Sequence, residues 1–188
     1  MRAIIFDPAH GNNVAGKRSP DGELLEWKWS REIIYKTIPL LKASGISCYI
    51  TNTEDYEIGL RERVRICNSI KENKKLLISI HLNGAGDGTK WCNARGFEVW
   101  TTIGEKKCDF FARKFIEKYK EVFPDLKNRG AKEMNFTVLT CDCPAVLLEI
   151  AFQDNKEDKE MVMNNEFKNK LIHDFLYPVL YDIATKIY

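Results

Sequence analysis

The chain has 188 residues, of which 44% are hydrophobic and 30% are charged, and it carries a formal net charge of +2. This length and composition predict a single domain with a sizeable core, and they exclude an intrinsically disordered protein. The near balance of charge argues against a dedicated nucleic-acid binder, whose basic residues gather on one face.

The N-terminal segment and the cysteines indicate in which cellular compartment the chain is made. The apolar run after Met1 stops at Asp7, so it is too short for a signal peptide or a membrane span. The six cysteines are scattered, which is not the pattern of a small disulfide-rich scaffold. We therefore expect synthesis in the cytoplasm without a signal peptide, and reduced, mostly buried cysteines. They are Cys48, Cys67, Cys92, Cys108, Cys141 and Cys143.

Short runs rich in apolar and β-branched residues alternate with stretches that have the spacing of helices. The runs predict strands at residues 2–6, 46–51, 76–81, 96–101, 136–139 and 145–150. Helices are expected at residues 26–43, near 60–67, near 111–122 and from 166 onwards. Pro39 and Pro178 predict kinks in the first and last of these helices. Residues 84–95 and 125–134 are expected to form long loops.

The alternation of strands and helices predicts an α/β fold. We expect one domain spanning residues 1–188, with a twisted, mainly parallel sheet of about six strands flanked by helices on both faces. The runs at 76–80 and 145–150 are almost continuously apolar, which is typical of central strands covered on both faces.

Candidate catalytic groups follow the expected strands. Open α/β sheets bind ligands beyond the carboxyl ends of their strands, and His10 and His81 both lie at such positions. Imidazole and carboxylate are zinc ligands, and a catalytic site uses three of them. Glu26, where the first loop turns into a helix, is the best local candidate for the third ligand. Sequence spacing leaves three competitors open, namely Glu23, Asp21 and Asp7.

Glu149 is a carboxylate within an otherwise apolar run. A buried, unpaired charge costs several kcal/mol, so such a group is neutralised, paired or placed near a metal. One interpretation is a salt bridge to Arg63 or Arg129. The other is a general base whose proton affinity is tuned by its surroundings.

A series of short motifs spans nearly the whole chain. In order, they are Asp7-Pro8-Ala9-His10-Gly11, Glu26 at a helix start, Leu60-Arg61-Glu62-Arg63 leading to Asn68, Ser79-Ile80-His81-Leu82-Asn83, Gly96-Phe97-Glu98-Val99, Asn128-Arg129-Gly130 with Asn135–Leu139, and Pro144-Ala145-Val146-Leu147-Leu148-Glu149 with Phe152 and Asn155. This series resembles the zinc-dependent N-acetylmuramoyl-L-alanine amidases of the Amidase_3 type, which include cell-wall amidases and phage endolysins. Ala9 and Ala151 stand where that family commonly has glycine.

The resemblance implies that His10, Glu26 and His81 bind Zn²⁺ and that Glu149 is the catalytic glutamate. It also implies a substrate, peptidoglycan or a muropeptide, cut between N-acetylmuramic acid and L-alanine. We expect a monomer that acts on the cell wall, in the manner of a phage or prophage endolysin, without nucleic acid or membrane as a partner. Two alternatives stay open: a degenerate module that binds peptidoglycan without cutting it, and a metallohydrolase acting on another amide.

Overall fold

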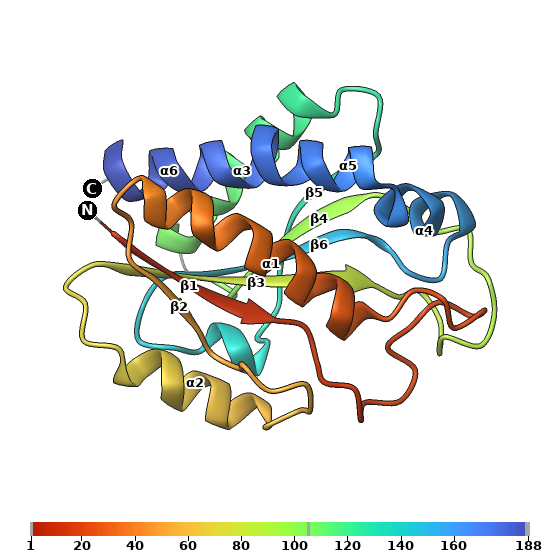
Figure 1. Ribbon diagram of the computed structural model, residues 1–188, viewed down its shortest axis with the longest axis horizontal. Coiled ribbons are helices and arrows are strands. Elements are labelled where there is room, and N and C mark those ends of the chain that lie inside the picture. The colour runs from red at the N-terminus through yellow and green to blue at the C-terminus, as the bar shows by residue number, and fades with distance from the viewer. Residues whose placement is uncertain (1, 105, 187–188) are drawn as a thin grey trace.

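The computed structural model describes residues 2–104 and 106–186 and contains a six-stranded sheet with the strand order β2-β1-β3-β6-β4-β5 (Figure 1). Neighbouring strands are parallel, except that β4 and β6 are antiparallel. The predicted α/β fold with a mainly parallel sheet is confirmed. The strands are β1 (Ala3–Pro8), β2 (Cys48–Ile50), β3 (Lys75–Asn83), β4 (Phe97–Thr101), β5 (Asn128–Glu133) and β6 (Ala145–Phe152).

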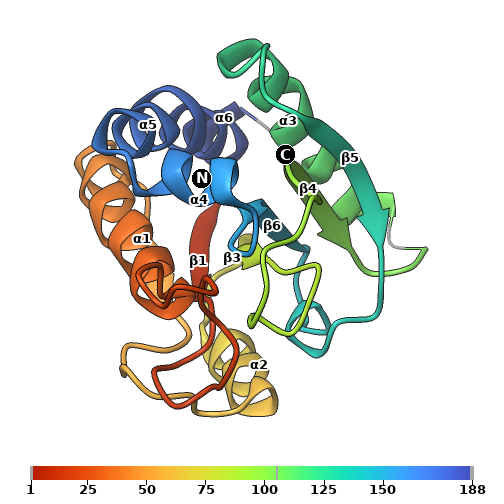
Figure 2. The same ribbon diagram turned by 90° about the vertical axis from the view of Figure 1, so that its right-hand side faces the viewer.

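Helices cover both faces of the sheet, as expected. Figure 2 shows α1, α3, α5 and α6 along one face and α2 on the other. The short 3₁₀ helix η1 packs beside α2. The helical elements are α1 (Glu26–Ala43), α2 (Leu60–Ser69), α3 (Lys106–Val122), η1 (Thr137–Leu139), α4 (Lys156–Met163), α5 (Asn165–Lys170), the π-helical segment η2 (Leu171–Leu176) and α6 (Tyr177–Lys186).

The core lies on both sides of the central strands. Ile4 and Phe6 of β1 pack with the helices of the larger face, whereas Ile5 between them packs with the α2 face. Side chains alternate in this way because successive residues of a strand point to opposite faces. Burial on both faces explains the continuous apolar runs of β3 and β6.

One predicted strand and one predicted loop are wrong. Residues 136–139 form η1 rather than a strand, and Val138 and Leu139 are buried against the α2 face of the sheet. The sheet still has six strands, because β5 forms within residues 125–134, the segment expected to be a loop. β5 is an edge strand without a fully buried residue, so its sequence carries no apolar alternation that would reveal it.

The helices differ from expectation in detail. α1 includes Pro39, and the kink expected there stays a prediction; the position is exposed, so water can satisfy the carbonyl that loses its amide partner. The last helical stretch widens into the π-helical segment η2 just before Pro178. The sequence pattern does not predict α4, whose mostly charged residues bury only Asp158 and Val162. No helix within residues 2–104 and 106–186 is long and apolar enough to cross a membrane.

Candidate metal centre

Three side chains from distant parts of the sequence meet at the carboxyl edge of the sheet. His10 follows β1, His81 lies near the end of β3, and Glu26 is the first residue of α1. His81 Nδ1 is 2.9 Å from Glu26 Oε1, and His10 Nε2 is 3.5 Å from Glu26 Oε2. The two imidazole rings are perpendicular, with centroids 5.0 Å apart. One ligand-type atom of each residue lies within 4.8 Å of the other two, a spacing at which they could hold a metal ion.

These side chains converge because the strands that carry or precede them are parallel neighbours in the sheet. β1, β3 and β6 are neighbours in the sheet, so their carboxyl ends lie at one edge. The Ser30 hydroxyl accepts a hydrogen bond from Ala9 N at 3.0 Å and donates one to Ile80 O at 2.6 Å. This buried hydroxyl ties the first turns of α1 to both strand ends. Glu26 is thereby held over the edge of the sheet, where its Oε1 also accepts from Leu82 N at 3.1 Å.

His10 adopts a backbone conformation that its neighbours enforce. Its φ of 40° lies in the left-handed region, where a non-glycine residue costs about 1–3 kcal/mol. The His10 carbonyl accepts hydrogen bonds from Arg31 Nη2 at 3.1 Å and from Arg63 Nη2 at 2.9 Å. Arg31 also donates to the carbonyl of Ala9, and Arg63 to that of Pro8. Two arginines from different helices therefore fix the turn that presents the His10 imidazole.

Gly11 completes this turn and has no room for a side chain. A Cβ atom there would lie 2.0 Å from the backbone nitrogen of Glu57. We expect Gly11→Ala to lower the free energy of unfolding by about 1–3 kcal/mol, because the two backbone segments must separate. Urea denaturation measures the change. Gly84→Ala is the matched control, since its Cβ would meet nothing closer than 3.5 Å; equal losses in both variants would contradict the steric explanation.

The competing acidic residues have other partners. Asp7 is 1% exposed and pairs with Arg63 at 2.9 Å. Asp21 and Glu23 both pair with Lys159, away from the two histidines. Of the four acidic candidates, Glu26 is thus the one that contacts both imidazoles.

Burial and charge set the protonation of the cluster. Burial lowers the pKa of His10 to about 4, although the charge of Glu26 opposes the shift. Burial also disfavours the charged forms of Glu26 and His81. Their hydrogen bond and mutual attraction outweigh it, so the pKa of Glu26 is lowered and that of His81 is raised. His10 is neutral at pH 7, which leaves a lone pair available to a metal ion.

Glu149 approaches the same edge from the neighbouring strand. β6 pairs with β3 so that Glu149 is in register with His81. Its Oε2 is buried and has no hydrogen-bond partner in the described part of the chain. Burial raises the pKa of Glu149 to about 8. A buried carboxyl oxygen without a structural partner, next to a cluster of titratable groups, is typical of a reactive site.

The salt bridge considered for Glu149 is wrong. Arg63 pairs with Asp7, and Arg129 pairs with the buried carboxylate of Glu98 on β4. Both guanidinium groups therefore already have carboxylate partners. The carboxyl group of Glu149 gains no cationic partner from either of them.

A small hollow adjoins the cluster. It has a volume of about 240 Å³ and is lined by Lys17, Gln153 and Asp154 together with glycines of the loop after β3. Gln153 Nε2 donates to Glu26 Oε2 at 3.3 Å, which places the hollow next to the candidate ligands.

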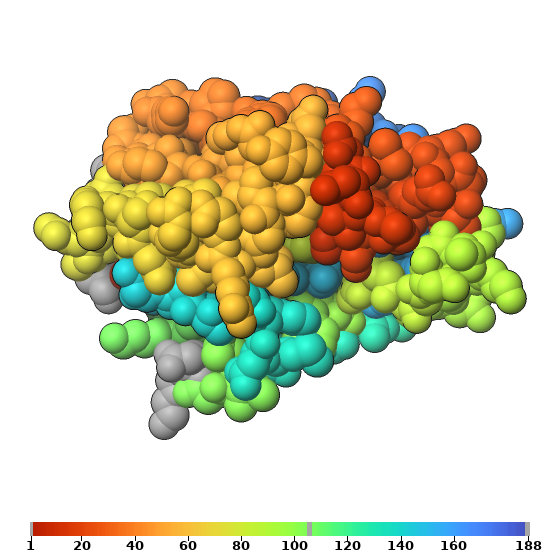
Figure 3. Space-filling view, turned by 90° about the horizontal axis from the view of Figure 1, so that it is seen from below, coloured from red at the N-terminus to blue at the C-terminus, as the bar shows by residue number. Residues whose placement is uncertain are grey.

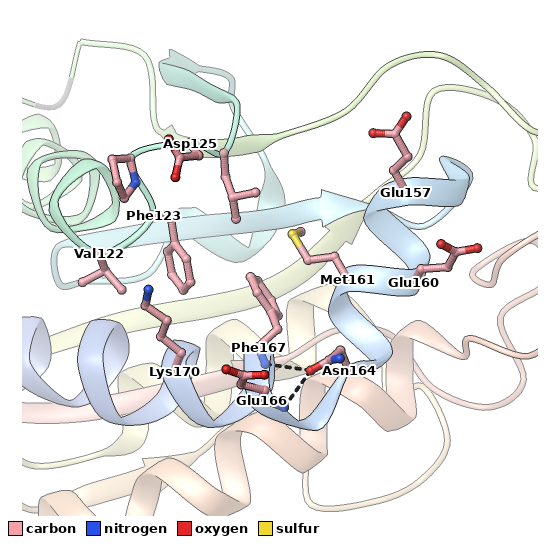
Figure 4. Close-up of a pocket in the computed structure, with 12 residues that line it drawn as sticks. Val122, Phe123, Asp125, Glu157, Glu160, Met161, Asn164, Glu166, Phe167 and Lys170 are labelled. Carbon is pink, nitrogen blue, oxygen red and sulfur yellow. Dashed lines mark hydrogen bonds between the residues drawn. The ribbon is translucent and has the colours of Figure 1, made fainter.

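A larger groove lies elsewhere. It measures about 620 Å³ and is formed by α4, α5 and the end of α3, with Phe123, Met161 and Phe167 among its apolar residues (Figure 4). None of the four candidate residues lines it. The groove is therefore separate from the candidate metal centre.

Sequence reasoning missed the residues that support the cluster. Arg31, Ser30 and Gln153 act through hydrogen bonds to backbone atoms or to Glu26. Their partners lie far away in the sequence, so no local motif marks them. For Arg31 the available signal was its place on the buried side of a helix, where an arginine needs hydrogen-bond partners.

Comparison with known proteins places this geometry in context. The profile of a family described as N-acetylmuramoyl-L-alanine amidase matches residues 4–176. The N-acetylmuramoyl-L-alanine amidase CwlM of Bacillus licheniformis is 28% identical over 170 residues, covering 89% of this chain and 63% of its own length. The endolysin of Bacillus phage SPP1 is 27% identical over 184 residues, covering 89% of this chain and 61% of its own length. The chain thus spans less than two thirds of the length of these relatives.

A solved structure shares the fold. The crystal structure of an N-acetylmuramoyl-L-alanine amidase from Clostridium difficile 630 superposes with a TM-score of 0.85 at 26% sequence identity. The match covers 98% of each chain. The sheet and helices described above are therefore those of this group of proteins.

Proposed function

Because this chain belongs to the Amidase_3 family of N-acetylmuramoyl-L-alanine amidases, we propose that it hydrolyses the amide bond between N-acetylmuramic acid and L-alanine in bacterial peptidoglycan. The observation that carries the proposal is the meeting of His10, Glu26 and His81 beside Glu149, whose buried Oε2 has no hydrogen-bond partner in the described part of the chain. Such a set supplies metal ligands and a proton-transfer group, which together suffice for metal-assisted amide hydrolysis.

The clustered side chains fit Zn²⁺, the cofactor expected of this family. Two imidazoles and one carboxylate are a donor set of catalytic zinc sites. Ligand atoms about 2.0–2.2 Å from a tetrahedral zinc lie about 3.3–3.6 Å apart. The distance between His10 Nε2 and Glu26 Oε2 is 3.5 Å. A neutral His10 and an ionised Glu26 bind a cation without changing protonation, whereas His81 gives up the proton that its raised pKa favours. We assign these two residues and His81 as the residues that hold the metal.

Glu149 serves as general base and then as general acid. When bound, Zn²⁺ supplies Lewis acidity, which polarises the scissile carbonyl, lowers the pKa of water and favours ionised carboxylates nearby. Glu149 Oε2 takes a proton from the attacking water and passes it to the nitrogen of the leaving L-alanine. A group that both accepts and returns a proton works best with a pKa near the working pH, and burial has moved the pKa of Glu149 up to about 8.

The arginines act as positioning groups in this mechanism. Arg31 and Arg63 both donate to the His10 carbonyl, so they fix the backbone turn that presents the imidazole to Glu26 and His81. A rigid ligand set keeps the reacting groups aligned, and misplacement by about 1 Å can lower a rate about 10²-fold.

His81→Ala tests the assignment of the metal ligands. We expect this variant to lose the zinc held by the histidine cluster and the ability to release muropeptides from purified sacculi. Elemental analysis and mass spectrometry of the digest measure both. His173→Ala is the matched control, because His173 is an exposed imidazole on η2. Equal zinc contents in the two variants would show that His81 is not a ligand.

The same digest separates the proposed function from the alternatives. An amidase releases stem peptides with a free amino-terminal L-alanine from intact sacculi. A degenerate binding module would hold sacculi without releasing peptides, and a hydrolase for other amides would leave sacculi intact while cutting small substrates.

The setting of the reaction is also a proposal. The similarity to a phage endolysin supports action on the cell wall. We infer that the chain acts there as a monomer, without nucleic acid or membrane as a partner. Size-exclusion chromatography combined with light scattering would check the oligomeric state.

A further inference from the structure

Three cysteines gather at the edge of the sheet where β6 begins, whereas Glu149 lies near the end of that strand. Cys67 is in the last turn of α2, and Cys141 and Cys143 lie in the turn before β6. Figure 3 shows α2 (yellow) and the segment before β6 (cyan) side by side on one face of the molecule. Cys143 Sγ is 3.8 Å from Cys67 Sγ and 3.7 Å from Cys141 Sγ. We call these three residues the thiol cluster.

The spacing of the sulfurs suits a thiolate-bound metal. A tetrahedral zinc with bonds to sulfur of about 2.3 Å holds its sulfurs about 3.8 Å apart. Both sulfur–sulfur distances given above match this value, and all three sulfurs lie within 4.8 Å of one another. A disulfide needs an S–S distance of about 2.05 Å. All three cysteines are free.

Hydrogen bonds hold the two limbs of the thiol cluster together. The backbone nitrogen of Asp142 donates to Asn68 Oδ1 at 2.9 Å, which joins the turn before β6 to the end of α2. Lys75 Nζ bridges the same limbs, with Asp142 Oδ1 at 2.8 Å and the Cys67 carbonyl at 3.0 Å. The sulfurs are therefore preorganised rather than brought together by chance packing, which lowers the cost of ordering them around a ligand.

Charge and access also favour a cation here. Three thiolates and one divalent cation leave one net negative charge, and Lys75 lies against the cluster. Arg2 lines the same hollow as Cys143, and its Nε has no hydrogen-bond partner in the described part of the chain. A second hollow, of about 430 Å³ and lined by Cys141 and Cys143, gives a metal ion and a fourth ligand access to these two sulfurs.

We propose that the thiol cluster is a second metal site, which binds a thiophilic divalent cation of the Zn²⁺ class through Cys67, Cys141 and Cys143. Soft thiolate sulfur selects such cations over Mg²⁺ or Ca²⁺. Binding releases the three thiol protons to solvent and leaves a fourth coordination position open to the hollow. The bound ion links α2 to the start of β6, and α2 is the helix that carries Arg63.

Metal counting on the reduced protein tests this site apart from the histidine cluster. After equilibration with Zn²⁺, the unaltered chain should hold two equivalents of zinc, and the double variant Cys141→Ser/Cys143→Ser should hold one. Cys48→Ser, which changes a half-buried cysteine on β2, should still hold two. His81→Ala should lose the other equivalent and keep the one at the thiol cluster. Equal zinc contents in the double variant and the unaltered chain would overturn the proposal.

Cd²⁺ provides a test that needs no substitution. Titrating Cd²⁺ into the reduced, unaltered protein should produce an ultraviolet cadmium–thiolate absorption that saturates at one equivalent. It should also protect three thiols from a thiol-specific reagent. Absence of the absorption from a protein whose cysteines are verified as reduced would overturn the proposal. If a disulfide is found within the thiol cluster, and the protein still takes up no metal after that disulfide is reduced, the proposal is also overturned.

Discussion

The Glu149→Gln variant is expected to hydrolyse peptidoglycan with a kcat about 10²–10⁴-fold below that of the unaltered chain. Glutamine has nearly the size and shape of glutamate, so the packing of β6 is preserved. The amide can neither take a proton from water nor return one to the leaving nitrogen. Because Glu149 is not one of the three clustered residues, the zinc content should not change.

The kinetic measurement is the release of new L-alanine amino termini from purified sacculi, with zinc per chain determined on the same samples. Glu160→Gln is the matched control, since it makes the same change at an exposed carboxylate on α4. Its kcat should equal that of the unaltered chain. Turnover by Glu149→Gln at the rate of the control would remove Glu149 from the mechanism.

A second readout of Glu149→Gln separates a reactive group from a structural one. A buried carboxyl oxygen without a partner is unfavourable in the folded state, so its neutral replacement should not lower the free energy of unfolding. Urea denaturation of the metal-free protein measures this. A loss of more than about 1 kcal/mol would instead indicate that the glutamate makes a stabilising hydrogen bond.

Arg63→Ala is expected to lower the free energy of unfolding by about 3–5 kcal/mol, the largest stability effect anticipated for this chain. The side chain of Arg63 is 1% exposed, as is that of Asp7, its ion-pair partner. Removing the guanidinium would leave the carboxylate of Asp7 buried without its cation. It would also remove a donor from the Pro8 carbonyl and one of the two arginine donors from the His10 carbonyl, so the zinc affinity should fall as well.

Two variants on the same helix control this prediction. Arg65→Ala removes a side chain that is 70% exposed and pairs with Glu62 on the surface, so it should change stability by about 0–1 kcal/mol. Arg63→Lys keeps the charge but not the planar fork, and it should recover only part of the loss. Denaturation midpoints for Arg63→Ala that match those of Arg65→Ala would show that the buried pair contributes little.

The sequence was informative about the site because its reactive side chains lie at or near the carboxyl ends of strands. His10 and His81 could be singled out from their positions after apolar runs, and Glu149 from a carboxylate inside one. The choice of Glu26 over its competitors rested on resemblance to a family. The structure supplies an independent reason, because the carboxylate of Glu26 is the one that contacts both imidazoles.

Other features depend on contacts that sequence patterns do not encode. The expectation of six strands was sound in number, yet β5 was missed because an edge strand with charged side chains has no apolar alternation. The cysteines were expected to be reduced and mostly buried. All six are free, but only Cys67 and Cys108 are fully buried, and the other four are partly exposed. The fold also brings Cys67 next to Cys143 across 76 residues, and no local spacing motif connects them.

The antiparallel pairing of β4 with β6 has a consequence for how this protein can diversify. Since β4 starts at the edge where β3 ends, the intervening segment leaves and returns on the same side of the sheet. Its limbs are clamped by Asp154, whose Oδ2 accepts from Gly86 N and whose carbonyl accepts from Cys92 N. Insertions or exchanges between these two clamps would reshape the hollow beside the histidine cluster without disturbing a strand pairing. Under the proposed function, this segment can therefore vary independently of the strands that carry the catalytic groups.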